Sequence, residues 1–160
     1  MDPTEIVAAL RGLPVGLRLI VTAGVNGSTI IDDTYNASTP SVLAALNLLA
    51  ETKGRKVAVL GDMAELGDYA PQEHEKVGMC AARVCDRLYL VGPLGEHTER
   101  GALAAGMSPA CIDRFETAEE ILPELRRSLA EGDVALLKGS RAMHLDALAA
   151  QIAAAEEGTS

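Results

Sequence analysis

The chain has 160 residues, 48% of them hydrophobic, which suits one domain with a core of its own. Its formal net charge of −9 at pH 7 argues against nonspecific binding to nucleic acid, because such binding needs a basic surface. The three cysteines form no Cys-x-x-Cys pair, no apolar run approaches about 18 residues, and the start has no signal-peptide pattern. The sequence therefore predicts a cytoplasmic protein without disulfides, zinc or a membrane span.

The first predicted elements form a β-hairpin. Residues 17–22 have the pattern of a strand, Asn26-Gly27 is typical of a two-residue hairpin turn, and residues 28–31 supply the antiparallel partner. Gly12 and Pro14 separate an opening segment, residues 1–15, which we expect to be an interdomain linker. One folded domain is predicted at residues 16–155, followed by a disordered tail at residues 156–160.

Strands and helices then alternate along the chain. Four further strands are predicted at residues 56–60, 87–91, 111–115 and 133–137, and the apolar runs at the first and last of these are typical of strands buried on both faces. Helices are predicted between them at residues 39–53, 71–84, 94–105 and 117–130, the last of these opened by a capping box at Thr117, with a final helix from the turn at 138–141 to residue 155. This order predicts an α/β fold, a three-layer Rossmann-like domain whose mostly parallel sheet has about six strands, an antiparallel opening hairpin and helices on both faces.

Polar residues gather directly after three of these strands. The clusters stand at residues 32–36, 62–65 and 138–141. In open parallel sheets, ligands bind beyond the carboxyl ends of the strands. We therefore expect three motifs that are distant in sequence to line one edge of the sheet.

The first cluster has two interpretations. Asp32 and Asp33 can receive ribose hydroxyls or hold a metal, and Asn36 can bind an adenine edge or a phosphate. The same residue types also form turns and cap helices, so a purely structural role is equally compatible with the pattern.

The other two clusters allow a similar choice. The turn at 138–141 offers two cations and backbone amides to a carboxylate or phosphate, while Ser140 as a plain helix cap is the alternative. The loop with Asp62 and Glu65 has glycines at both ends but no P-loop pattern, so a structural loop is the simpler interpretation. His74 follows on the next helix, and none of the histidines has the spacing of a metal-binding pair.

Taken together, the three motifs resemble one family. Residues 31–37 (IDDTYNA), 59–67 (VLGDMAELG) and 137–143 (LKGSRAM), with His74 and Gly78 after the second, look like the C-terminal domain of the Mur ligases, and within them of the MurF branch. The motifs occur in the same order, and the resemblance covers about residues 16–152.

The resemblance implies an ATP-dependent amide ligase of peptidoglycan synthesis, which adds D-alanyl-D-alanine to UDP-N-acetylmuramoyl-tripeptide. In such ligases an N-terminal domain holds the UDP-sugar peptide, a central domain holds ATP and Mg²⁺ with a P-loop, and the last domain brings the dipeptide. The carboxylate is activated as an acyl phosphate and then attacked by the dipeptide amine. We therefore expect this chain to be the last domain, to have the other two as partners, and to be inactive alone.

The resemblance also implies roles for individual residues. Asp33 would contact the ATP ribose, Asn36 would lie beside the nucleotide, and Arg18 would reach it when the domains close. The carboxylate of the dipeptide would bind Lys138, Ser140 and Arg141. Further side chains expected to line the site are Asp32, Tyr35, Asp62, Glu65 and His74. No metal ligand and no catalytic residue is expected within this domain alone.

Two alternatives remain. The chain could be a stand-alone α/β module that binds a nucleotide or metabolite, or the same domain of a sibling Mur ligase. The sibling that adds the third amino acid would carry Asp-Tyr-Ala-His and Lys-Gly-His-Glu, which differ from residues 33–36 and 138–141 here.

Overall fold

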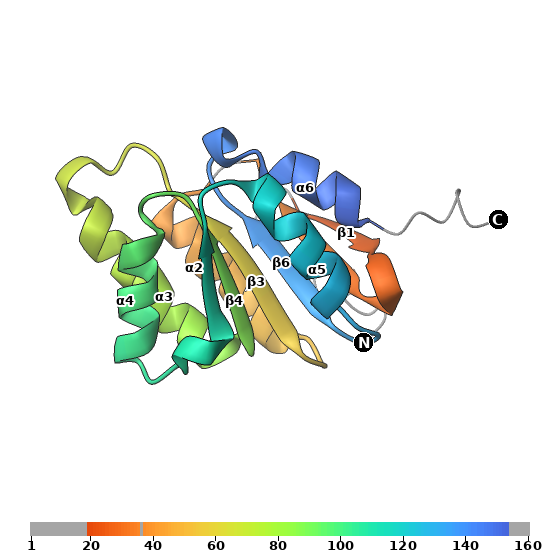
Figure 1. Cartoon of the computed structure of the whole chain (residues 1–160). Coiled ribbons are helices and arrows are strands. Elements are labelled where there is room, and N and C mark those ends of the chain that lie inside the picture. Colours follow the sequence, from red (N-terminus) through yellow and green to blue (C-terminus); the bar gives the residue numbers. More distant parts are fainter. Residues whose placement is uncertain (1–18, 36, 154–160) are drawn as a thin grey trace.

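A six-stranded sheet forms the centre of the computed structural model, which describes residues 19–35 and 37–153 (Figure 1). Its strand order is β1-β2-β6-β3-β4-β5. The bounds are β1 (Ile20–Ala23), β2 (Thr29–Asp33), β3 (Lys56–Gly61), β4 (Arg87–Val91), β5 (Ile112–Phe115) and β6 (Val134–Lys138). Only the β1–β2 pair among these neighbours is antiparallel, which confirms the predicted mostly parallel sheet with an opening hairpin.

Helices cover both faces of the sheet. They are α2 (Thr39–Glu51), α3 (Ala70–Val84), α4 (Gly95–Ala104), α5 (Leu122–Ser128) and α6 (Leu145–Ile152). The first three pack on one face and the last two on the other, so the predicted three-layer architecture is confirmed (Figure 1). Within the described part of the chain, no helix is long and apolar enough to cross a membrane.

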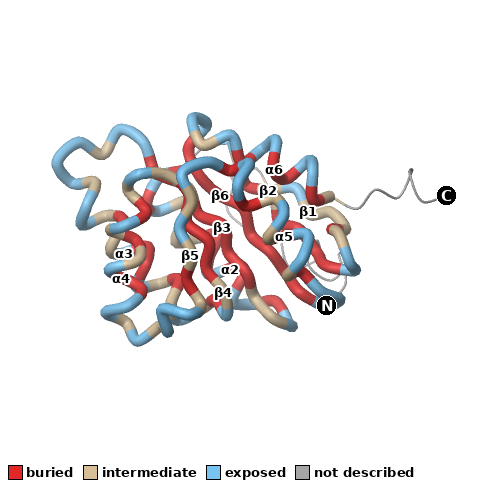
Figure 2. The backbone as a smooth tube through the Cα atoms, viewed as in Figure 1, coloured by how far each residue is buried: buried red, intermediate tan, exposed pale blue. Residues whose placement is uncertain are grey.

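The two helical layers explain the continuous apolar runs in the central strands. In β3, Val57 and Val59 pack with α5 and α6, whereas Ala58 and Leu60 point to the opposite face and pack with α2 and α3. Side chains of successive strand residues alternate between the faces, so a strand covered on both sides needs apolar residues at every position. All of β6 is buried for the same reason (Figure 2).

The opening hairpin has a longer loop than the predicted two residues. Ala23 pairs with Thr29, so Gly24 to Ser28 form the connection. Asn26 and Gly27 do take the left-handed conformation expected of them, with φ of 59° and 83°. The Asn26 amide nitrogen also donates to the carbonyls of residues 126 and 129, at 2.8 and 2.9 Å, which fastens the loop to the end of α5.

Two predicted helix starts are also wrong. The Thr117 side chain makes no capping hydrogen bond; instead, Glu120 accepts from the amide of Glu116, and a 3₁₀ turn (Ala118–Ile121) precedes α5. The last helix begins at Leu145, because a 3₁₀ turn (Arg141–Met143) and a left-handed residue, His144, intervene. The start of α2 agrees with the sequence, since Ser38 accepts a hydrogen bond from the backbone amide of Ser41.

Candidate functional site

The sheet order brings the three polar motifs together. Strand β6 lies between β2 and β3, so the carboxyl ends of these three strands are neighbours. Lys138 Nζ lies 2.7 Å from Asp33 Oδ2, and the amide of Ser140 donates to the carbonyl of Asp62 at 2.9 Å. The prediction that the motifs line one edge is confirmed.

Asp33 and Lys138 form a buried ion pair. Only 3% and 2% of their surfaces are exposed. Burial raises the pKa of the Asp33 carboxyl, and the hydrogen bond and charge of Lys138 oppose that rise. Two residues expected to contact nucleotide and dipeptide therefore bind each other in this structure.

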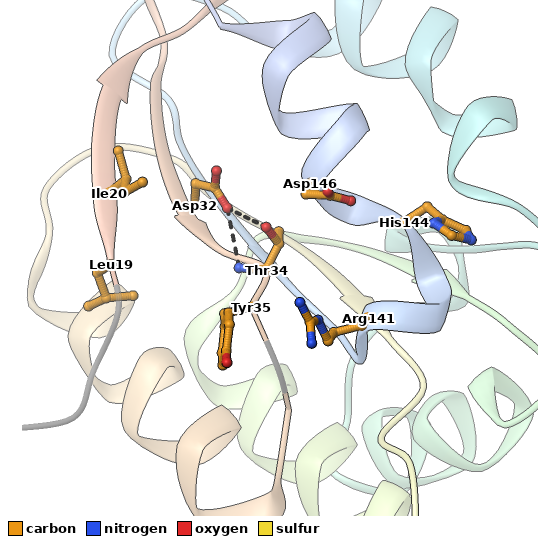
Figure 3. A pocket seen from close by; sticks show the side chains of 8 residues that line it. All are labelled: Leu19, Ile20, Asp32, Thr34, Tyr35, Arg141, His144 and Asp146. Carbon is orange, nitrogen blue, oxygen red and sulfur yellow. Dashed lines mark hydrogen bonds between the residues drawn. The ribbon is translucent and has the colours of Figure 1, made fainter.

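A cavity of about 500 Å³ opens at the carboxyl end of β2, and we call it the strand-end cavity (Figure 3). It unites predicted residues of the first motif, Asp32 and Tyr35, with Arg141 of the third. Its lining residues are Leu19, Ile20, Asp32, Thr34, Tyr35, Arg141, His144 and Asp146. Candidate nucleotide-binding and dipeptide-binding motifs thus share one space.

Local contacts fix the polar side chains of the strand-end cavity. Asp32 Oδ1 accepts hydrogen bonds from the amide and the hydroxyl of Thr34, at 3.2 and 2.7 Å. The guanidinium of Arg141 lies over the Tyr35 ring, 5.1 Å from its centroid, which is the geometry of a cation–π contact. Ile20 is 60% exposed and adds an apolar surface (Figure 3).

Asp62 and His74, which were expected to line the site, have structural contacts. The Asp62 carboxylate accepts from the amide of Leu94, at 3.1 and 3.3 Å, and so holds the start of α4; burial raises its pKa. His74 Nε2 accepts from the amide of Met63 at 3.1 Å, and Nδ1 lies 2.7 Å from the carbonyl of Ala70. These partners assign the proton to Nδ1 of a neutral ring.

The remaining predicted residues lie in different surroundings. Ser140 is buried, whereas Glu65 is exposed and has a φ of 63°. Arg18 and Asn36 fall outside the described residues, as do the predicted linker and tail, so their roles stay predictions.

Sequence reasoning missed part of the cavity lining. Leu19 and Ile20 were assigned to an ordinary strand, and no feature of the pattern marks them as cavity residues. His144 is not spaced from another histidine as in a metal-binding pair. Asp146 lies in the first turn of an Ala-rich helix, where the helix dipole alone is enough to explain an acidic residue. Among the described residues, no group of three or more His, Cys, Asp and Glu side chains could hold a metal.

Comparison with known proteins places the chain in a family. Residues 17–141 match the profile described as "Mur ligase, glutamate ligase domain". The chain is 34% identical over 148 residues to the UDP-N-acetylmuramoyl-tripeptide–D-alanyl-D-alanine ligase of Bacillus subtilis, covering 90% of this chain and 32% of that protein. The chain thus spans about a third of the length of that relative.

Solved structures agree with the sequence match. A MurF structure from Acinetobacter baumannii superposes with a TM-score of 0.71 at 32% identity, covering 94% of this chain and 33% of the other. The MurF ligase of Thermotoga maritima in complex with ADP gives a TM-score of 0.69 at 29% identity, covering 87% and 30%. By its profile, sequence relatives and fold, the chain belongs to the Mur ligase family and corresponds to the C-terminal domain of its MurF branch.

Proposed function

We propose that this chain positions D-alanyl-D-alanine and closes over ATP in a ligase that joins the dipeptide to UDP-N-acetylmuramoyl-tripeptide during peptidoglycan synthesis. One observation carries the proposal: the Asp33–Lys138 bond joins two distant motifs, and their neighbours Asp32 and Arg141 line the same strand-end cavity. The relatives of the chain bear the name of this activity, and the chain covers only 32% and 27% of two of them, which leaves room for the two further domains that the reaction needs.

ATP is the co-substrate in this proposal, since a MurF relative was solved with ADP. ATP supplies the phosphoryl group that activates the carboxylate of the tripeptide, and Mg²⁺, held by the central domain, neutralises its phosphates. We assign the ribose contact in this domain to Asp32 rather than to Asp33, because Asp32 lines the strand-end cavity and Asp33 is buried against Lys138. ATP is abundant in the cytoplasm, and we propose that compartment for the ligase.

Arg141 and Tyr35 supply the dipeptide contact. A guanidinium binds a carboxylate through two parallel N–H donors, and the Tyr35 ring beneath it limits the conformations of the arginine. Lys138 and Ser140 contribute indirectly. The Asp33–Lys138 ion pair and the hydrogen bond from the Ser140 amide fix the position of the backbone that leads to Arg141.

The test is ATP-dependent phosphate release by a complete ligase that carries this chain as its C-terminal domain, supplied with the nucleotide-linked tripeptide and Mg²⁺. We expect release only when D-alanyl-D-alanine is present, and a diamino acid should not replace it, since that is the substrate class of the sibling ligase. Absence of dipeptide-dependent release would contradict the proposed function.

The same assay tests the ribose assignment. Asp32→Asn should raise the KM for ATP by about 10-fold, the usual effect of losing a hydrogen bond to a charged group. The exposed substitution Asp68→Asn serves as its control. An unchanged KM for ATP would remove Asp32 from the nucleotide site.

A further inference from the structure

Two opposite charges face the strand-end cavity without neutralising each other. Arg141 and Asp146 both line the cavity, and both are exposed. No ion pair joins them, and within residues 19–35 and 37–153 Asp146 has no hydrogen-bond or ion-pair partner. The Arg141 side chain contacts the Tyr35 ring. Its N–H donors bind no carboxylate among the described residues.

The two residues stand on successive elements of the backbone. Arg141 opens the 3₁₀ turn, and Asp146 lies in the first turn of α6. Between them His144 adopts φ 55°, and its ring points away from the other labelled side chains in Figure 3. The next residue, Leu145, is only 1% exposed and anchors the start of the helix in the core. Arg141 and Asp146 therefore reach the strand-end cavity from two different elements.

A small zwitterion carries the two charges that this cavity can pair, a carboxylate for Arg141 and an ammonium for Asp146. The ammonium nitrogen and the carboxylate of an extended dipeptide are roughly 5–6 Å apart, from standard backbone dimensions. The phosphates of a nucleotide are a poorer match for Asp146, because the described lining residues include two carboxylates, Asp32 and Asp146, and one guanidinium, that of Arg141. Thr34 already occupies one oxygen of Asp32 with two hydrogen bonds, whereas Asp146 has no partner among the described residues.

We propose that Asp146 binds the ammonium group of the incoming dipeptide while Arg141 binds its carboxylate. The apolar side chains of Leu19 and Ile20 offer a surface for the two methyl groups. This inference rests on the proposed function and adds to it the residue that recognises the reacting end of the substrate. Asp146 thus orients the amine and selects dipeptides whose two ends are both free.

The competing explanation is that Asp146 only stabilises α6, because an acidic residue near a helix N-terminus interacts favourably with the helix dipole. That role affects unfolding but not substrate affinity. Steady-state kinetics of the complete ligase separate the two. Asp146→Asn should raise the KM for D-alanyl-D-alanine by about 10- to 100-fold and leave the KM for ATP unchanged, as expected for a lost bond to a charged group. Asp146→Glu should recover part of the loss.

The matched control is Glu131→Gln, which removes an exposed carboxylate at the opposite end of β6 and should leave both KM values unchanged. A second probe is D-lactyl-D-alanine, in which a hydroxyl replaces the ammonium. As a competitive inhibitor, it should bind the wild-type ligase about 10- to 100-fold more weakly than the dipeptide binds, whereas Asp146→Asn should bind both about equally.

Three outcomes of these experiments would overturn part or all of the proposal. Dipeptide-dependent phosphate release with an unchanged dipeptide KM in Asp146→Asn overturns the role of Asp146 and leaves the proposed function standing. Absence of dipeptide-dependent release in the wild-type ligase overturns both. A lower melting temperature of Asp146→Asn with an unchanged preference for the ammonium-bearing dipeptide identifies Asp146 as a helix-stabilising residue.

Discussion

The ammonium of Lys138 lies 2.7 Å from the carboxylate of Asp33, and only 2% and 4% of these side chains are exposed. The pair joins the carboxyl ends of β6 and β2, where the backbone turns toward the strand-end cavity. An ion pair so placed cannot exchange either partner for water, so each charge depends on the other.

Lys138→Met should lower the free energy of unfolding by about 3–5 kcal/mol, because it leaves the carboxylate of Asp33 buried without a counter-charge. Asp33→Leu should have a similar effect through the orphaned ammonium. The double variant should lose much less than the sum of the two, as measured by urea denaturation in a double-mutant cycle. Additive losses would mean that the two charges are not coupled.

Asp62→Asn should change the pH dependence of stability. Burial raises the pKa of Asp62 in the folded chain, so between its unfolded and folded pKa values the folded state holds a proton that the unfolded state has lost. Wild-type stability therefore falls, relative to the Asn variant, as the pH rises from about 4 toward neutrality, and the difference disappears in more acidic solution. Denaturant titrations at several pH values measure it. A difference that grows on acidification would contradict the assigned direction, and Asp68→Asn is the exposed control.

Gly139→Ala should destabilise the fold by about 1–3 kcal/mol, the usual effect of overpacking. A Cβ at this position would lie 2.8 Å from Leu145 Cδ1 and 2.9 Å from the Cα of Gly61. Backbone of β3 cannot yield without disturbing the sheet. The control is Gly95→Ala, where the nearest atom is the Leu90 Cβ at 3.3 Å and the helix gains a better helix former. Equal losses at the two glycines in thermal denaturation would show that close approach is not the cause.

Glu65→Gly should raise stability by up to about 1 kcal/mol. Glu65 is exposed and has φ 63°, a backbone conformation that destabilises an L-residue with a Cβ by about 1–2 kcal/mol. Glycine removes this penalty but loses more conformational entropy on folding, so only part of the gain remains. Glu65→Ala keeps the Cβ and should bring no gain, so it separates backbone strain from loss of charge. Equal melting temperatures for the Gly and Ala variants would refute the strain.

The architecture was readable from the sequence because it depends on local pattern. Strand β3 and strand β6 are apolar at nearly every position, and Gly54 and Gly132 mark where the neighbouring helices must end. The site was only partly readable. The partner of Asp33, Lys138, lies 105 residues away in the sequence. No local pattern indicates that the Lys138 side chain points into the fold rather than toward a ligand.

Elements that depend on tertiary contacts were missed for a similar reason. The hairpin loop was predicted from Asn26-Gly27 as a minimal turn, but the Asn26 side chain bonds to the end of α5, about 100 residues away in sequence. The position of Asp146 at the cavity was not predicted, because the helix dipole alone explains an acidic residue in the first turn of a helix.

The position of β6 has a consequence for how the domain is made. Every hydrogen-bonded link between the β1–β2 hairpin and the β3–β4–β5 sheet in the described chain passes through β6. Before β6 is available, the hairpin and the β3–β4–β5 sheet each have an unpaired edge, and such edges promote aggregation. The last strand therefore completes the sheet, and the strand-end cavity cannot form before that strand is inserted.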